Sequence, residues 1–162
     1  MEVQTVFIAK DLVSHQAYCP GDDPTPYGIT FDVNREVLKL SKTLSDLIED
    51  VGEDAVLVIP CEHVSIAMFG DFILPWCQYH HENPTRWDPK TPQLSTVPSQ
   101  DWDLLSQHNN ETLFECIIAA NYLDLGELLE QCCFFAAKEL FHGKNVDQLR
   151  AMFPAKVPES QD

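Results

Sequence analysis

The first half of the chain contains three short segments with the hydrophobic pattern of β-strands. Residues 3–10 are rich in β-branched and aromatic side chains, and residues 28–33 alternate apolar with polar positions. Residues 55–60 form an apolar run that ends at a proline. Alternation with a period of two is typical of a strand with one buried face. The first two segments are predicted to pair as a hairpin, joined by a long Pro- and Gly-containing loop over residues 10–28.

Helix patterning begins directly after the second predicted strand. Asn34 is placed to cap a short helix over residues 35–40. Ser41 is placed to cap a second helix over residues 42–52, where apolar side chains recur at helical spacing until Gly52. These two helices are predicted to separate the second strand from the third.

Residues 61–81 predict one long helix with a disturbance in it. Pro75 lies inside this apolar-periodic segment. An interior proline costs about 3 kcal/mol or more, because it removes a backbone donor and clashes with the preceding turn. We therefore expect a kink or a break near residues 71–72. Residues 82–100 hold four prolines and few aliphatic side chains, which predicts an exposed loop and a candidate for disorder.

The second half of the chain predicts helices only. They are expected over residues 102–107, 111–124, 126–141 and 145–153. Asp101 is predicted to cap the first of them, and Asn110 or a neighbour the second. The tail is polar and is expected to fray. Strands at the front followed by helices predict the α+β class.

Two of these helices have more apolar surface than one buried face requires. Residues 113–120 are apolar on almost every side, whereas a surface helix normally shows one apolar stripe. The helix over residues 126–141 has two apolar faces. One face holds Leu128, Cys132, Phe135 and Ala136, and the other holds Leu129, Cys133, Ala137 and Leu140. One face is expected to close the domain and the other to bind a partner protein.

Charge narrows the classes of partner. The net charge is −16 at pH 7, with a pI near 4.5. Binding to nucleic acid or to an anionic membrane requires lysine and arginine, so we expect neither partner. The acidity favours basic protein surfaces, and an equally good interpretation is that it only keeps the protein soluble. No signal peptide and no run of about 20 apolar residues is present, so a cytoplasmic and nuclear location is expected.

The search for catalytic or metal chemistry gives one weak candidate. No cofactor loop or nucleophile motif occurs, so neither an enzyme nor a cofactor is expected. The six cysteines lie mostly in apolar segments without a C-x-x-C pair, which is typical of free thiols in a reducing compartment. Cys77, His80 and His81 are the best zinc candidate, but zinc needs three or four ligands. A buried cysteine followed by a polar helix end is the favoured interpretation.

Several motifs, taken in order, resemble one known family. The helical half reads TLFECIIAANYLDLGELLEQC over residues 112–132 and KELFHGKNVDQLRAMF over 138–153. The long predicted helix before them ends in WCQYHH at 76–81. In this order the motifs resemble the S-phase-kinase-associated (Skp) adaptor family, over roughly residues 3–153.

The resemblance implies a fold and a function. The fold is a BTB/POZ-like α+β core, with a small mixed sheet and helices, plus a C-terminal helical extension. The core is expected over residues 1–124 with its Pro-rich loops at 10–28 and 82–100, followed by F-box-binding helices over 125–153 and a polar tail over 154–162. The implied function is a non-catalytic adaptor that links a cullin scaffold to F-box substrate receptors in an SCF E3 ubiquitin ligase and so promotes substrate ubiquitination and degradation.

The resemblance also implies binding residues. The cullin is expected to bind Asn121 and Tyr122; from the sequence alone, Tyr122 could equally pack only against the next helix. The residues expected to bind the F-box are Phe114, Leu128, Leu129, Cys133, Leu140 and Phe141. An alternative with the same fold is an elongin-C-like subunit or a self-associating BTB interaction protein.

Four features depart from the pattern of the family. The family pattern continues through further helices where this chain stops at Asp162. The loop over 10–28 is longer than is usual, and Pro75 interrupts the long helix. One extra residue precedes Gly143. These departures predict a divergent, C-terminally shortened member.

Overall fold

The computed structural model describes residues 2–85, 87–88, 90 and 97–152, and within them three strands form one small mixed sheet. The strands are β1 (Val3–Ala9), β2 (Gly28–Asn34) and β3 (Leu57–Ile59), in the order β2-β1-β3. β1 pairs with β2 in antiparallel fashion and with β3 in parallel fashion, with Val6 opposite Leu57. The predicted α+β class and the predicted hairpin are confirmed.

The central strand is buried on both faces. Val6 and Ile8 point into the main core, whereas Phe7 points to the other side and stacks on Tyr18 with ring centroids 3.8 Å apart. This second side is covered by α1 (Leu12–Ala17) and the residues after it. The expectation of a loop throughout residues 10–28 is therefore wrong. Asp11 begins the helix, because its carboxylate accepts a hydrogen bond from the Ser14 backbone N–H at 2.7 Å.

The two short helices after β2 begin where the sequence predicts, and they end two residues and one residue earlier than predicted. Asn34 caps α2 (Arg35–Leu38) by accepting from the Glu36 N–H at 3.0 Å. Ser41 caps α3 (Lys42–Val51), and Gly52 ends it with a positive φ of 92°.

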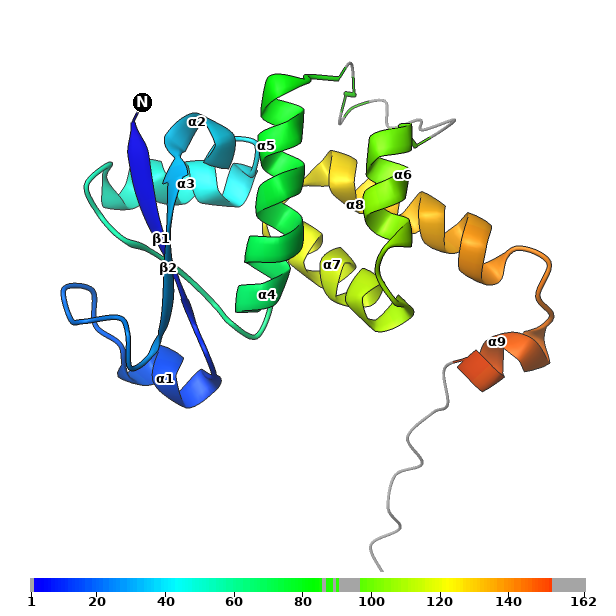
Figure 1. Ribbon diagram of the computed structural model, residues 1–162, viewed down its shortest axis with the longest axis horizontal. Coiled ribbons are helices and arrows are strands. Elements are labelled where there is room, and N and C mark those ends of the chain that lie inside the picture. Colours follow the sequence, from blue (N-terminus) through cyan, green and yellow to red (C-terminus); the bar gives the residue numbers. More distant parts are fainter. Residues whose placement is uncertain (1, 86, 89, 91–96, 153–162) are drawn as a thin grey trace, which may run out of the picture.

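The predicted long helix begins later than expected and has a π-helical turn in its middle. Ser65 caps it, so residues 61–64 form turns instead of helix. It consists of α4 (Ile66–Met68), the π-helical turn η1 (Phe69–Ile73) and α5 (Leu74–Glu82). The Leu74 N–H donates to the carbonyl of Phe69, five residues back. The disturbance expected near residues 71–72 is thus a π-turn just before Pro75, and the helix runs on beyond it (Figure 1).

The remaining regular elements of the described chain are helices. They are α6 (Ser99–Ser106), α7 (Asn110–Tyr122), α8 (Gly126–Phe135), the π-helical turn η2 (Ala136–Phe141) and α9 (Val146–Met152). Asn109 caps α7. The π-helical turn η2 lies where the resemblance indicates one extra residue, and a π-turn is the geometry that accommodates one more residue in a helix. The predicted polar tail over 154–162 lies outside the described residues.

One hydrophobic core joins the two halves of the chain. It runs from Val6 in β1 to Ala136 in η2 and contains buried residues on both sides of position 124. Figure 1 shows the helix of α4 and α5 between the sheet with α1–α3 and the group α6–α8, while α9 stands apart. No residue of α9 is buried. The domain boundary predicted at residues 124 and 125 stays a prediction.

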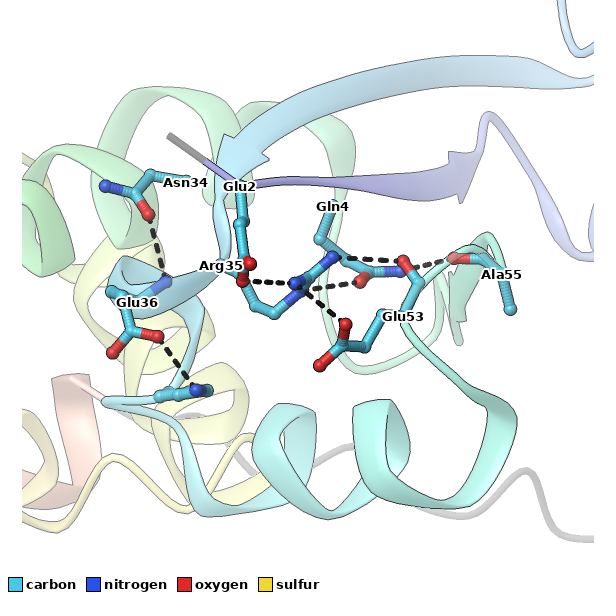
Figure 2. Close-up of polar contacts among 8 residues, drawn as sticks. Glu2, Gln4, Asn34, Arg35, Glu36, Glu53 and Ala55 are labelled. Atoms are coloured by element: carbon cyan, nitrogen blue, oxygen red, sulfur yellow. Dashed lines mark hydrogen bonds and ion pairs between the residues drawn. The ribbon is translucent and has the colours of Figure 1, made fainter.

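A buried arginine ties the start of the chain to the sheet (Figure 2). Arg35 is 6% exposed and donates to the Glu2 carboxylate at 2.6 Å and to the Gln4 side chain at 3.5 Å. It also lies 3.3 Å from the Glu53 carboxylate and donates to the Glu53 carbonyl. Gln4 in turn donates to the Ala55 carbonyl. Burying a guanidinium is tolerated only because its donors are paired in this way.

Replacing Arg35 with methionine is expected to lower the free energy of unfolding by about 2 kcal/mol or more, because Gln4 and the two carboxylates lose their common donor. Urea unfolding followed by circular dichroism measures it. The matched control is Lys39→Met, which removes an exposed ion pair with Glu36 and is expected to leave the urea midpoint nearly unchanged. Equal losses for the two variants would contradict the structural role of Arg35.

Candidate functional site

Helix α7 ends without a glycine, because Asp124 adopts the conformation that usually requires one. Asp124 has a φ of 51°. The Leu125 N–H donates to the Ala120 carbonyl at 2.9 Å, and the Asp124 N–H donates to the Asn121 carbonyl at 3.3 Å. This pair of bonds is the Schellman motif, and aspartate is among the residues that tolerate the left-handed conformation. The helix therefore ends at Tyr122, two residues earlier than predicted.

The first turn of α3 holds this end of α7 in place. The Ser41 hydroxyl donates to the Leu123 carbonyl and also caps α3 by accepting from the Leu44 N–H. The Thr43 hydroxyl donates to the Tyr122 carbonyl at 2.8 Å. Terminal helix carbonyls lack partners within their own helix, and α3 supplies these partners here. The backbone that carries Asn121 and Tyr122 is therefore fixed by hydrogen bonds to a second helix.

Asn121 and Tyr122 lie on one surface with two further residues, and we call these four residues the Tyr122 face: His63, Ile118, Asn121 and Tyr122. Asn121 is exposed, and Tyr122 is half-buried and stacks on His63 with ring centroids 4.9 Å apart and an angle of 16° between the rings. Desolvation raises the pKa of the Tyr122 hydroxyl above its ordinary value. Ile118 lies one turn earlier on α7 and is 52% exposed.

A small hollow continues this face. It has a volume of about 260 Å³ and is lined by His63, Ile118 and neighbouring residues of the turn before α4. An aromatic ring that keeps a polar hydroxyl, next to an exposed aliphatic side chain, is typical of a protein-binding surface. His63 was not predicted, because it lies in a turn whose position beside α7 no sequence pattern indicates.

The continuous helix formed by α8 and η2 has the two faces that the sequence predicts. The face with Leu128, Cys132, Phe135 and Ala136 is buried in the core. The face with Leu129, Cys133, Ala137 and Leu140 is half-buried or exposed. Leu128 is 0% exposed, so its assignment to the F-box-binding surface is corrected: its side chain packs into the domain core.

The other residues expected to bind the F-box are accessible to different degrees. Phe114 on α7 is half-buried, and so are Leu140 and Phe141 in η2, which pack partly against the core. Leu129 and Cys133 line a larger hollow with a volume of about 800 Å³, which we call the α8 groove. Its apolar walls come from Leu40, Trp76, Trp87, Leu125 and Leu129, and its carboxylates come from Asp124, Glu127 and Glu130.

One wall of the α8 groove comes from the segment that was expected to be an exposed loop. The Thr85 hydroxyl donates to Glu127 Oε1 at 2.7 Å, and the Trp87 indole N–H donates to Glu130. A Cβ atom at Gly126 would lie 2.5 Å from the Trp87 ring, so the indole packs directly on the α8 backbone. Pro84 and Thr85 are exposed and belong to no helix or strand, as predicted for a loop, whereas Trp87 is half-buried against α8. Residues 86, 89 and 91–96 lie outside the described part.

A buried chain of polar side chains forms the floor beneath the α8 groove. His80 Nε2 lies 2.9 Å from both carboxylate oxygens of Asp101, and the Gln131 amide donates to Asp101 at 2.9 Å. The Trp76 indole N–H donates to the Gln131 carbonyl oxygen at 3.1 Å. The prediction that Asp101 caps α6 is therefore wrong. α6 begins at Ser99, and Asp101 points inward from its first turn.

These contacts bear on the zinc candidate. Burial raises the pKa of the Cys77 thiol to about 12, and a protonated thiol is a poor metal ligand. His80 is engaged by Asp101, and His81 is exposed. Across residues 2–85, 87–88, 90 and 97–152, no group of three or more His, Cys, Asp or Glu side chains could hold a metal ion.

No helix in the same ranges is long and apolar enough to span a membrane. All six cysteines are free, and the Cys116 and Cys132 sulfurs lie 3.6 Å apart.

Comparison with known proteins finds relatives that are named as subunits of ubiquitin ligases. A family model described as "Skp1 family, tetramerisation domain" matches residues 28–82. The chain is 33% identical over 138 residues to the SCF ubiquitin ligase complex protein SKP1b of Dictyostelium discoideum, covering 82% of this chain and 83% of that protein. It is 32% identical over 142 residues to a Skp1-related protein of Caenorhabditis elegans, covering 82% and 80%. It is 30% identical over 141 residues to the E3 ubiquitin ligase complex SCF subunit sconC of Arthroderma otae, covering 83% and 84%.

The two consecutive leucines of α8 are expected to respond differently to truncation. Leu128→Ala removes a fully buried side chain and is expected to lower the free energy of unfolding by about 3 kcal/mol. Leu129→Ala removes a half-buried side chain at the groove and is expected to cost less than about 1 kcal/mol. Urea unfolding of both variants measures the difference. Similar losses would contradict the assignment of one leucine to the core and the other to the surface.

Proposed function

The chain belongs to the Skp1 family, and from this membership we propose that it is a non-catalytic adaptor that links a cullin scaffold to F-box substrate receptors in an SCF ubiquitin ligase. Its relatives are named as subunits of this complex. Such an adaptor promotes substrate ubiquitination by holding the receptor on the scaffold. Free thiols in all six cysteines support a reducing compartment, and we propose the cytoplasm and the nucleus as its location.

The observation that carries this proposal is the presence of two accessible apolar surfaces on connected helices. The Tyr122 face lies at the end of α7, and the α8 groove lies along the next helix. α7 and α8 pack against each other through the core, which includes Cys116 and Cys132. An adaptor requires two binding surfaces held in a fixed relation, and a pair of packed helices supplies that relation.

We assign the cullin to the Tyr122 face. Tyrosine dominates the energetics of many interfaces, because it offers a large apolar area and a hydroxyl with little loss of conformational entropy. The half-buried ring of Tyr122 is held by His63, and its backbone is held by Thr43, so little further ordering is needed on binding. Asn121 supplies an exposed amide next to it.

We assign the F-box to the surface formed by Leu129 and Cys133 with Phe114, Leu140 and Phe141. Leu129 and Cys133 lie one helical turn apart on the open side of α8 and line the α8 groove. Hollows with apolar walls are the usual binding sites for the apolar face of a partner helix. The carboxylates around this groove favour a partner with basic residues.

Replacing Asn121 and Tyr122 with lysine is expected to abolish capture of a cullin N-terminal domain. Two lysines would put desolvated positive charge where the tyrosine ring and the amide are expected to make contact. Because Asn121 is exposed and Tyr122 is only partly buried, the thermal melt followed by circular dichroism should stay nearly unchanged. A pull-down with purified cullin domain measures the effect.

The control for this experiment is Val13→Lys. The Val13 side chain is 76% exposed, and it lies on α1, far from α7 in the sequence. The variant adds a lysine at an exposed apolar position and is expected to leave cullin capture intact. Undiminished capture by the double variant would reject the assignment of the Tyr122 face.

Replacing Leu129 and Cys133 with lysine is expected to weaken binding of the F-box and not of the cullin, the reverse of the effect expected for the Asn121 and Tyr122 double variant. F-box capture should fall by more than about tenfold, because the charges would line an apolar groove, while cullin capture stays at its normal level. Co-purification from cells followed by mass spectrometry, with each partner counted separately, measures both. Parallel loss of cullin and F-box proteins would indicate a general folding defect and contradict two separate surfaces.

A further inference from the structure

The floor of the α8 groove contains a buried histidine whose second nitrogen is unpaired. His80 is 4% exposed, and its Nε2 lies 2.9 Å from each carboxylate oxygen of Asp101; one of these oxygens, Oδ2, also accepts from Gln131. A carboxylate can only accept hydrogen bonds, so the proton of the ring lies on Nε2. When the ring is neutral, Nδ1 is then a lone-pair acceptor.

Nothing in the described part of the chain lies within hydrogen-bonding distance of this Nδ1 atom. The nearest charged group is Glu127 Oε2 at 3.9 Å, which is too far for a hydrogen bond. Glu127 is 14% exposed, and its other oxygen accepts from Thr85. A buried polar atom without a partner is costly, so a donor that reaches it from a bound protein would be stabilising.

His80 Nδ1 and Glu127 Oε2 are both hydrogen-bond acceptors, so a group that binds between them has to be a donor. Two acceptors 3.9 Å apart can be bound by the N–H groups of one ammonium or guanidinium nitrogen, each at an ordinary hydrogen-bond distance. Glu127 adds a negative charge that such a cation would neutralise. A partner carboxylate or phosphate would meet the lone pair of Nδ1 and the Glu127 charge, and both would repel it.

The charges around the groove also favour a cation. Asp124, Glu127 and Glu130 line it, and among its described lining residues Lys42 carries the only formal positive charge. The Lys42 ammonium lies 2.8 Å from Asp46, so its charge is already paired. The start of α8 contributes about half a positive charge, which the three carboxylates exceed.

We propose that the α8 groove binds a helix of the F-box receptor that carries one lysine or arginine among its apolar anchors, and that this side chain inserts between Glu127 and His80 Nδ1. The proposal rests on the function proposed above and adds a basic residue to the partner's specificity. The aliphatic stem of such a side chain would pack on the apolar walls, and Trp76 and Trp87 offer aromatic faces to its charge. Thr85 and Trp87 act as positioning residues that hold Glu127 and close one side of the groove.

The test is a double-mutant cycle between this chain and a consensus F-box domain used as the probe. Glu127→Gln removes the charge and keeps an oxygen that can accept from Thr85. Each lysine and arginine of the probe is replaced with methionine in turn. For one of these positions, both single changes are expected to weaken binding about tenfold, and the double change no further. Isothermal titration calorimetry with the full chain measures each affinity.

The matched control is Asp124→Asn, which removes another carboxylate of the same groove. Asn tolerates the positive φ of 51° found at this position, so the fold is preserved. This variant is expected to weaken binding about twofold through the loss of general charge, with additive effects for every change in the probe. A second measurement uses the unaltered chain: the ¹⁵N resonance of His80 Nδ1 is expected to move when the probe binds.

The outcomes separate this inference from the proposed function. Coupling of Glu127 to one basic residue, with a shifted Nδ1 resonance, supports the inference. Binding of the probe with additive effects at every basic position, or with an unmoved Nδ1 resonance, overturns it and leaves the adaptor function intact. Failure of the unaltered chain to bind any consensus F-box domain overturns both.

Discussion

A carboxylate buried without full hydrogen bonding would unfold this protein, and the way in which Asp101 is paired determines how the C-terminal helices pack. Asp101 comes from α6, and its partners His80 and Gln131 come from α5 and α8. Gln131 also accepts a hydrogen bond from Trp76, so its amide group has one fixed orientation, with the oxygen toward Trp76 and the nitrogen toward Asp101. Apolar contacts alone would let these helices slide by small amounts. Hydrogen bonds between buried groups restrict them to one arrangement, because any shift leaves a buried polar atom unpaired.

That arrangement places the two proposed binding surfaces. α8 presents Gln131 inward to the network and therefore presents Leu129 and Cys133 outward, each a little under half a turn around the helix from it. α7 packs on α8 and ends where α3 binds its last carbonyls through Ser41 and Thr43. The apolar character of α7 on almost every side follows from this position. One side faces the core, and Ile118 remains accessible on another.

The sequence allowed most helices and strands to be predicted, because their signals are local. Caps such as Asn34 and Ser41, and the two faces of α8, depend on residues a few positions apart. Two of the wrong predictions concern Asp101, whose residue type is typical of a cap but which pairs with residues 21 and 30 positions away, and Leu128, which the family resemblance grouped with surface residues. The helical periodicity had grouped Leu128 with Cys132, Phe135 and Ala136, apart from Leu129 and Cys133, without indicating which of the two faces is buried. The structure shows that the face with Leu128 is the buried one.

The separation of core and surface on α8 has a consequence for how such a protein can diverge. Exchanges at Leu129, Cys133 or Trp87 alter a surface and leave the buried network intact, so under the proposed function they would change partner choice at little cost in stability. Exchanges at Gln131 or Asp101 leave buried groups unpaired and cost stability before they alter any surface. The segment with Trp87 is the extreme case, because it follows α5 outside the regular elements and still forms a wall of the α8 groove. A chain about one-third identical to its relatives can therefore keep the packing of the family and present a groove of its own.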